Sequence, residues 1–395
     1  MKICMVLQKD FPPDIRVENE ASALIAAGHT VHLLCRNQAR MNPAETVKGI
    51  QVHRLVPFSS NKKINSLCTV PLFFNPLWCA HLNRVVREHA IQVIHVHDLP
   101  LVPLGLFIGR RYKIPLVYDM HENYPAALKV WRRPNMIYWT IKNPALAGVL
   151  DKFCQQQADQ IIVVVAEQRQ NLIEQGIPPQ KITVISNTAD LTQLTRLPID
   201  PAIIQRYQND FVMAYIGGFS PDRDLNIPIE GIPALIDEIP YIRLLLVGSG
   251  DARYTTELKR LVHRLNLEKW VEFVNWVPFE KIASYMTAAK VGIIPQPNNL
   301  FINTTIPHKL FQYMAFGLPV VVSDAKPLAR VVNEGHCGVI FKSGSAADFA
   351  RAILEIKKST INFGENGKKL VRERYNWAKT ATDLVHLYQR IEGGI

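Results

Sequence analysis

The segment 304–319 places Lys309 just inside the start of a predicted helix. Thr304 and Thr305 can cap this helix, Pro307 tolerates its first turn, and a following glycine ends it before an apolar, strand-like run. A helix start presents free amides to an anion, and Lys309 adds a full positive charge beside them. Phosphate is the ligand that this pattern favours, so we predict a nucleotide-linked substrate.

Two other predicted strands end in glycines. Gly248 and Ser249 follow one of them, and Gly217 and Gly218 follow the other, with Arg223 shortly after. Bare backbone lets a nucleotide approach closely, and an arginine can clamp a diphosphate bidentately. Each segment also fits an ordinary tight turn with a surface arginine. The Asp-x-Asp around Arg223 is more typical of a turn than of a cation site.

Histidines and acids follow two predicted strands in the first half of the chain. His121 and Glu122 follow one strand, and Asp98 follows the His-x-His of residues 95–97. Titratable groups at strand ends can move protons or bind hydroxyls. The two histidines flank an apolar residue, as strand residues do, so we favour a substrate contact by His121 over a metal site. A satisfied structural histidine is the alternative.

The loop after the first predicted strand carries Asp14 and Arg16. We predict that both charges reach the same edge of the sheet. Solvated loop charge explains them equally well.

Strand-like and helical patterns alternate along the chain, which positions these residues at the ends of strands. The predicted strands of the first half are 2–7, 30–35, 93–96, 116–118, 161–165 and 182–185. Those of the second half are 211–216, 244–247, 271–274, 291–294 and 320–322. The pattern predicts an α/β fold with two doubly wound parallel sheets. Ligands of such sheets bind at the carboxyl ends of the strands, so we expect a cleft between the two domains.

A chain of 395 residues exceeds the usual size of one hydrophobic core. We predict an N-terminal domain over 1–190, a second domain over 196–375 and a final helix over 376–395. Polar residues and prolines interrupt the periodicity over 187–201, which we predict to be a hinge.

The net charge of +11 allows a nucleic acid, a membrane surface or a polyanionic substrate. No nucleic-acid-binding motif accompanies it, so we expect no nucleic acid partner. Trp131 and Trp139 stand among basic and aliphatic residues, which suits either a membrane headgroup layer or a helix packed on the sheet. We expect a cytoplasmic protein, because no apolar run is long enough for a membrane span or a signal peptide. The basic segment with its tryptophans would give it peripheral contact at the inner face of the plasma membrane.

Six cysteines are scattered without CxxC spacing, which is typical of free thiols in a reducing compartment. They predict neither disulfides nor zinc.

The order and spacing of these motifs resemble the retaining glycosyltransferases of family 4, whose GT-B architecture has two facing Rossmann-like domains. The resemblance covers almost the whole chain and rests on residues 11–17, 27–29, 95–98, 119–122, 184–187, 217–223, 246–251 and 307–317. It implies transfer of a hexose from a nucleotide diphosphate sugar, by default a UDP-glucose-like donor, with retention and without a cofactor or metal. It also implies that the final helix crosses back to the first domain.

The resemblance assigns the site residues and the partners. The implied catalytic residues are His121, Glu122, Arg223 and Lys309. The implied donor site comprises Gly217, Gly218, Arg223, Gly248, Ser249, Val277, Thr304, Thr305, Ile306, Lys309 and Gln312. The implied acceptor site comprises Asp14, Arg16 and Asp98. The acceptor would be a glycan or a lipid-linked saccharide, as in exopolysaccharide and other polysaccharide biosynthesis.

Three positions depart from the family pattern. Thr304 and Gln312 stand where paired glutamates are common, and Gly218 replaces an arginine. Glutamine can bind ribose hydroxyls, but threonine offers no carboxylate. A non-catalytic nucleotide-sugar-binding subunit and a nucleotide-sugar epimerase therefore stay as alternatives. A dinucleotide oxidoreductase is disfavoured, because no GxGxxG follows the first strand. Our working mechanism is front-side displacement of the diphosphate.

Overall fold

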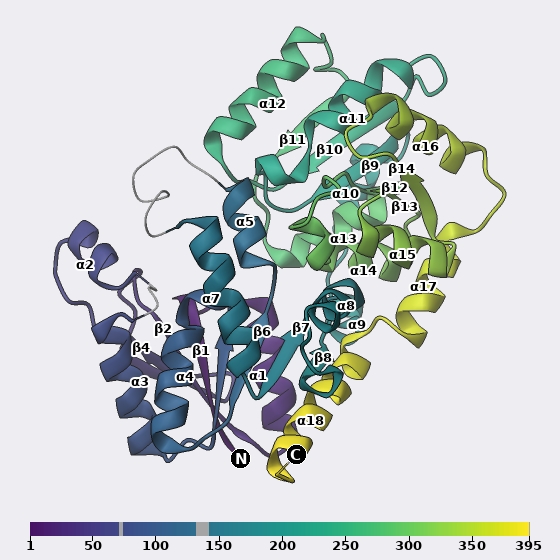
Figure 1. Cartoon of the computed structure of the whole chain (residues 1–395). Helices are drawn as coiled ribbons and strands as arrows, with labels where there is room; N and C mark the ends of the chain where they lie inside the picture. The colour runs from purple at the N-terminus through teal and green to yellow at the C-terminus, as the bar shows by residue number, and fades with distance from the viewer. Residues whose placement is uncertain (71–73, 132–141, 395) are drawn as a thin grey trace. The chain divides into compact units, whose positions relative to one another are not determined.

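The computed structural model describes residues 1–70, 74–131 and 142–394. It divides into two compact units, one formed by Met1–Ser186 together with Thr380–Ile395 and the other by Asn187–Lys379. Each unit has its own sheet and its own hydrophobic core (Figure 1).

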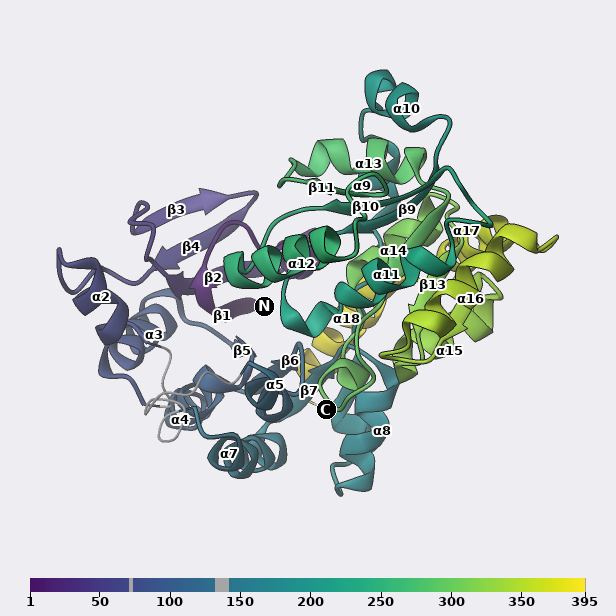
Figure 2. The same ribbon diagram turned by 90° about the horizontal axis from the view of Figure 1, so that it is seen from above.

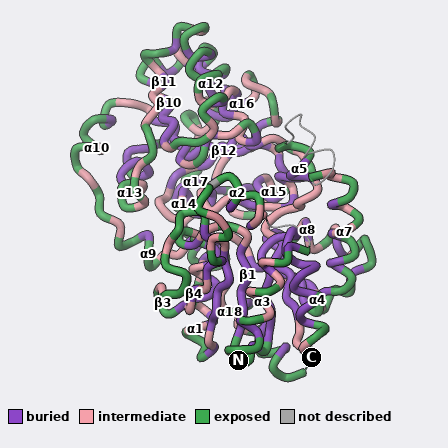
Figure 3. Tube along the Cα trace, turned by 90° about the vertical axis from the view of Figure 1, so that its left-hand side faces the viewer, coloured by how far each residue is buried: buried purple, intermediate pink, exposed green. Residues whose placement is uncertain are grey.

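The first unit is built on an eight-stranded sheet with the order β3-β4-β2-β1-β5-β6-β7-β8. All its pairings are parallel except that between β3 and β4. The strands are β1 (Lys2–Asp10), β2 (Thr30–Arg36), β3 (Ala44–Val47), β4 (Ile50–Arg54), β5 (Val93–His97), β6 (Leu116–Met120), β7 (Gln160–Val163) and β8 (Ile182–Val184). The central strands are buried on both faces, as a parallel sheet covered by helices requires (Figure 3).

Helices of the first unit cover both faces of this sheet, with α3, α4 and α7 on the viewer's side in Figure 1 and α1 behind. They are α1 (Ile15–Ala26), α2 (Lys62–Cys68), α3 (Pro76–His89), α4 (Val102–Tyr112), α5 (Tyr124–Val130), α7 (Pro144–Gln157), α8 (Ala166–Glu174) and most of α18 (Trp377–Glu392). Asp14 caps α1, since its carboxylate accepts a hydrogen bond from the amide of Val17 at 3.2 Å.

The second unit has a six-stranded parallel sheet with the order β11-β10-β9-β12-β13-β14. Its strands are β9 (Phe211–Ile216), β10 (Ile242–Val247), β11 (Val271–Val274), β12 (Val291–Ile294), β13 (Val320–Ser323) and β14 (Gly338–Phe341). Figure 2 shows α11 and α12 on one side of β9–β11 and α13 on the other. The sheet is therefore doubly wound.

The helices of the second unit are α9 (Leu191–Thr195), α10 (Pro201–Tyr207), α11 (Asn226–Gly231), α12 (Ala252–Arg264), α13 (Phe279–Ala288), α14 (His308–Ala315), α15 (Lys326–Gly335), α16 (Ala346–Lys358) and α17 (Phe363–Glu373). Short 3₁₀ turns lie between elements of both units, namely η1 (Leu99–Leu101), η2 (Pro179–Lys181), η3 (Pro221–Arg223), η4 (Ile232–Ala234) and η5 (Ile302–Thr304).

The predicted α/β class with two doubly wound parallel sheets is confirmed. Local details differ from the prediction. β7 ends at Val163 rather than at residue 165, and the predicted hinge contains the short helix α9. Three strands were not predicted, namely β3, β4 and β14. Within the described residues, no helix combines the length and the apolar character that crossing a bilayer requires.

Candidate active site

Asp119 is the centre of a buried polar cluster at the carboxyl end of the first sheet. It lies near the end of β6 and is fully buried. Its Oδ2 lies 3.0 Å from Nε2 of His121 and 3.1 Å from Nδ1 of His97. The parallel strands β5 and β6 pair side by side, so the groups that follow them meet. The predicted neighbourhood of His121 and Asp98 is real, since His121 Nδ1 lies 3.6 Å from Asp98 Oδ2.

Arg16 enters this cluster from the first turn of α1. Its guanidinium donates to both carboxylate oxygens of Asp119, at 2.8 and 3.2 Å, and to the carbonyl of Ile185 at 2.9 Å. It also pairs with Glu20 at 3.0 Å. Arg16 is therefore a buried helix residue with partners inside the protein, not the loop residue that we predicted. Its contact with an acceptor stays a prediction, as does that of Asp14.

The charges of this cluster explain its protonation states. Burial alone would lower the pKa of His121, but the carboxylates of Asp98 and Asp119 outweigh it and raise the pKa to about 9. Burial would raise the pKa of Asp119, but Arg16 and His121 hold it well below its usual range. His121 is therefore an imidazolium at neutral pH, a hydrogen-bond donor and not a general base.

Metal-ligating side chains also gather here, because Glu20, His95, His97 and Asp119 have ligand atoms within 4.8 Å of one another. The Arg16 guanidinium already occupies the carboxylates of this group. A fixed cation at that position opposes a second one. We therefore read the group as a structural network around His121.

The second unit brings two glycine turns into contact. Gly217 follows β9 with φ +146°, and Gly248 follows β10 with φ +139°. A Cβ on Gly248 would lie 2.1 Å from the carbonyl oxygen of Gly217. Both positions therefore require glycine, and the exposed backbone of Gly218 and Ser249 follows them.

Lys309 stands over these turns from α14. Its Nζ lies 3.5 Å from the centroid of the Tyr215 ring, a cation–π contact. A Cβ on Gly217 would lie 2.5 Å from the same Nζ, so the turn and the ammonium are neighbours. Within the described part of the chain, no carboxylate lies within ion-pair distance of Lys309. Burial, followed by the nearby Arg223, lowers the pKa of Lys309 well below its usual value, which a bound anion would reverse.

Arg223 lies at the end of η3, with its side chain about a third exposed. Its Nε lies 3.4 Å from the carboxylate of the buried Asp222, which orients the guanidinium. Lys309 and Arg223 influence one another electrostatically, so the two predicted cations do converge on one region of the second unit.

The start of α14 differs from the prediction. The helix begins at His308, and Pro307 is its extended N-cap residue without a side-chain cap. Thr304 lies in η5, fully buried, and donates its hydroxyl to the carbonyl of Phe301 at 2.8 Å. The predicted capping by Thr304 or Thr305 is therefore wrong, because η5 turns the chain before the helix begins. Pro307 contributes no side-chain cap to α14, and the amide of Leu310 donates to the carbonyl of Pro307 at 3.2 Å.

The remaining predicted donor residues lie in different surroundings. Ile306 is buried, and its carbonyl accepts a hydrogen bond from Asn187 at 3.0 Å. Thr305, Val277 and Gln312 are half-buried, Val277 in the segment between β11 and α13 and Gln312 on α14. Glu122 is half-buried beside His121. The donor contacts of these residues stay predictions.

Sequence reasoning missed Asp119 as the centre of the first cluster and Tyr215 as the platform of Lys309. The sequence did show Asp119 as an acid at the end of a predicted strand. It also showed Arg16 as a charged residue that could pair with this acid. Tyr215 read only as a strand residue. Of the predicted membrane residues, Trp131 is described and 41% exposed, whereas Trp139 lies outside the described residues.

The comparisons with known proteins agree with this geometry. Residues 13–188 match the family model of the glycosyl transferase 4-like domain, and residues 210–359 match that of glycosyl transferases group 1. The chain is 24% identical, over 93% of its length and 88% of the relative's, to D-inositol 3-phosphate glycosyltransferase of Thermomonospora curvata.

Solved structures show the same fold. Sucrose-phosphate synthase of Thermosynechococcus elongatus superposes with a TM-score of 0.76 at 20% identity, over 100% of both chains. The Anabaena protein Alr3699/HepE in complex with UDP-glucose superposes with a TM-score of 0.73 at 18% identity, over 99% of this chain and 100% of that one. With both family models matched in sequence order, this chain belongs to the family 4 type of glycosyltransferases and has the GT-B fold.

Proposed function

We propose that this glycosyltransferase moves a hexose from a UDP-sugar, in the first instance UDP-glucose, to a glycan or lipid-linked saccharide in polysaccharide biosynthesis. The observation that carries the proposal is the setting of Lys309. It is a cation without a carboxylate partner among the described residues, beside two glycine turns and in the first turn of a helix. That combination suits the diphosphate of a nucleotide sugar.

We infer uridine as the base of the donor from structures with the same fold, and not from a residue of this chain. The Anabaena protein HepE is crystallised with UDP-glucose. The amides of Gly217 and Gly248 already donate to the carbonyls of Val247 and Val274 at 2.9 Å. The exposed residues Gly218 and Ser249 follow them, and their amides could donate hydrogen bonds to a diphosphate.

We propose front-side displacement with retention of the anomeric configuration. The bond from the anomeric carbon to the diphosphate oxygen breaks, the acceptor oxygen attacks from the same face, and the leaving oxygen takes the acceptor proton. Lys309 and Arg223 stabilise the charge that develops on the diphosphate, so the proposed reaction needs no divalent metal. His121 does not serve as the base in this scheme, because its raised pKa keeps it protonated.

A second acceptor class has a specific observation in its favour. The relative from Thermomonospora curvata is named a D-inositol 3-phosphate glycosyltransferase. A small phosphorylated polyol would suit the basic character of this chain, whose net charge is +11. Acceptor screening therefore includes inositol phosphates and sugar phosphates beside oligosaccharides and lipid-linked saccharides.

We also propose peripheral contact with an anionic membrane. Helix α7 exposes Leu146, Val149 and Phe153 at 52, 72 and 45%, and their spacing places them on one face beside the exposed Lys152. An apolar stripe with a lysine suits the headgroup boundary. Flotation with vesicles that contain anionic lipid tests this, with Val149→Asp as the variant and Ile361→Asp, an exposed apolar position of the second unit, as the control.

The experiment that tests the function is calorimetric binding of UDP-, GDP-, ADP- and dTDP-sugars with and without EDTA, followed by turnover with the acceptor panel. Ligand that binds only the folded protein also raises its melting temperature. We expect saturable, EDTA-resistant binding of one UDP-sugar, and product only when an acceptor is present.

Other outcomes identify the alternatives. Binding without turnover on any acceptor supports a non-catalytic subunit, and a changed sugar without an acceptor supports an epimerase. Failure of every nucleotide sugar to bind would contradict the proposal, and would mean that Thr304 and Gln312 do not maintain a donor site.

A further inference from the structure

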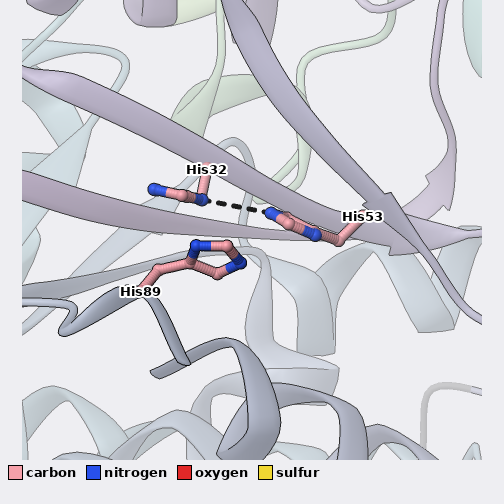
Figure 4. Close-up of side chains that lie close together, drawn as sticks. All are labelled: His32, His53 and His89. Atoms are coloured by element: carbon pink, nitrogen blue, oxygen red, sulfur yellow. Dashed lines mark hydrogen bonds between the residues drawn. The ribbon is translucent and has the colours of Figure 1, made fainter. Parts of the chain in front are cut away.

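Three histidines that are far apart in the sequence come together beside the first sheet. His32 lies on β2, His53 on the neighbouring strand β4, and His89 is the last residue of α3 (Figure 4). Helix α3 packs against β2, which brings the ring of His89 against the other two. Neither the transfer chemistry nor the Asp119 cluster uses these side chains.

The ring nitrogens of the three histidines converge. Nδ1 of His32 lies 3.1 Å from Nε2 of His53, and one ligand atom from each ring lies within 4.8 Å of the others. The ring of His89 lies tilted against both, with centroid distances of 4.4 Å to His32 and 4.9 Å to His53. Tetrahedral zinc with Zn–N bonds of 2.0–2.1 Å separates its ligand nitrogens by about 3.4 Å. The His32–His53 distance is already close to that value.

No acid holds these rings together. Among the described residues, no carboxylate lies within ion-pair distance of His32, His53 or His89. Imidazole nitrogens bind metals without any acid beside them. A stack of neutral rings is the plain alternative, but it leaves His89 without a hydrogen bond inside the described part of the protein.

We propose that His32, His53 and His89 form a binding site for a divalent transition metal ion, Zn²⁺ in the first instance. Three imidazole ligands suit Zn²⁺, Cu²⁺ and Ni²⁺, and a water molecule would complete a tetrahedral zinc site. His32 is buried, whereas His53 and His89 are half-buried, so an ion can enter from the side of His89.

The surroundings include features for and against a cation. His89 ends α3, where the negative end of the helix dipole favours positive charge. The exposed Glu88 adds a negative charge near His53, while Arg84 opposes it. A bound ion would join the end of α3 to β2 and β4. His32 lies near the amino end of β2, whereas His121 follows the carboxyl end of β6. The histidine site is therefore separate from the cluster around His121.

The test is metal binding by the full-length, tag-free chain after dialysis against a chelator. We expect one Zn²⁺ per chain in a competition titration with a chromophoric chelator, and the visible d–d bands of tetrahedral Co²⁺ when cobalt is added. Zn²⁺ should also raise the melting temperature. The half-buried His89 is the position to change, since His89→Gln leaves the buried His32 in place.

We expect His89→Gln to weaken Zn²⁺ binding by about tenfold or more and to abolish the cobalt bands. The control is His263→Gln, because His263 also lies in the last turn of a helix but is 86% exposed and outside the cluster. It should bind Zn²⁺ as the wild type does. Absence of a stoichiometric site in the wild type, or equal binding by wild type and His89→Gln, overturns the proposal.

Discussion

The hydroxyl of Tyr388 lies 2.7 Å from Nδ1 of His95, and both residues are fully buried. Tyr388 belongs to α18 at the end of the chain, and His95 belongs to β5 in the centre of the first sheet. Nε2 of His95 lies 3.5 Å from the carboxylate of Asp119. The last helix is therefore connected by hydrogen bonds and close polar contacts to the cluster that surrounds His121.

Tyr388→Phe should lower the free energy of unfolding by about 1–3 kcal/mol, because it leaves a buried nitrogen of His95 without a partner. Urea denaturation measures the effect. Tyr241→Phe is the control, since Tyr241 is 51% exposed and its loss should cost less than about 0.5 kcal/mol. Equal stability of both variants would show that the buried hydrogen bond contributes nothing.

Arg16→Met should destabilise the protein by about 3–5 kcal/mol, because it removes the guanidinium that pairs with the buried carboxylate of Asp119 at 2.8 Å. The same denaturation experiment applies. The matched control is Arg253→Met, which breaks an exposed pair with Glu257 and should change stability by less than about 1 kcal/mol. A small effect of Arg16→Met would contradict the ionic reading of the cluster.

Lys309→Met should lower kcat by about 100-fold with little loss of stability, because its charge is needed mainly when the diphosphate leaves. Steady-state kinetics with the identified donor and acceptor measures this. Lys326→Met is the control, since Lys326 also lies at the start of a helix, α15, but is exposed. Unchanged kcat in Lys309→Met would remove the lysine from the proposed mechanism.

The ionisation of His121 predicts a pH dependence of stability. Its pKa is about 9 in the folded protein, above the value of about 6.5 expected for an unfolded chain. The stabilisation is therefore complete below pH 6.5 and is lost as the pH rises through 9, with an upper bound of about 3 kcal/mol. Unfolding of wild type and His121→Gln between pH 6 and pH 10 tests this, and the difference between them should shrink as the pH rises. A constant difference would exclude the raised pKa.

Gly248→Ala should weaken nucleotide-sugar binding and lower the melting temperature. The new Cβ would meet the carbonyl of Gly217 at 2.1 Å, and the backbone at Gly248 has φ +139°. The control is Gly148→Ala in α7, where no atom lies within 4 Å of the new Cβ. That change should stabilise the helix by about 0.5–1 kcal/mol. Wild-type binding by Gly248→Ala would show that the two turns can separate without cost.

The sequence by itself determined the two sheets and most of their strands. β9 and β12 begin and end at the predicted residues, because a buried parallel strand needs a continuous apolar run between turn residues. Strand β3 is an exposed antiparallel edge strand with the sequence AETV, so it carries no such signal. Lys309 was also predicted locally, as a cation just inside a helix start, and Arg223 as a cation that follows a strand and a glycine turn.

Tertiary structure decided which of these residues meet. Arg16 and Asp119 are separated by 103 positions, and only the parallel pairing of the sheet and the docking of α1 bring their charges to 2.8 Å. The three histidines beside β2 come from two strands and a helix end, so no local spacing announces them. The hydrophobic pattern of a single segment indicates which of its faces is buried. Contacts between polar groups depend on how separate segments pack, because burial forces each charge to find its partner elsewhere in the chain.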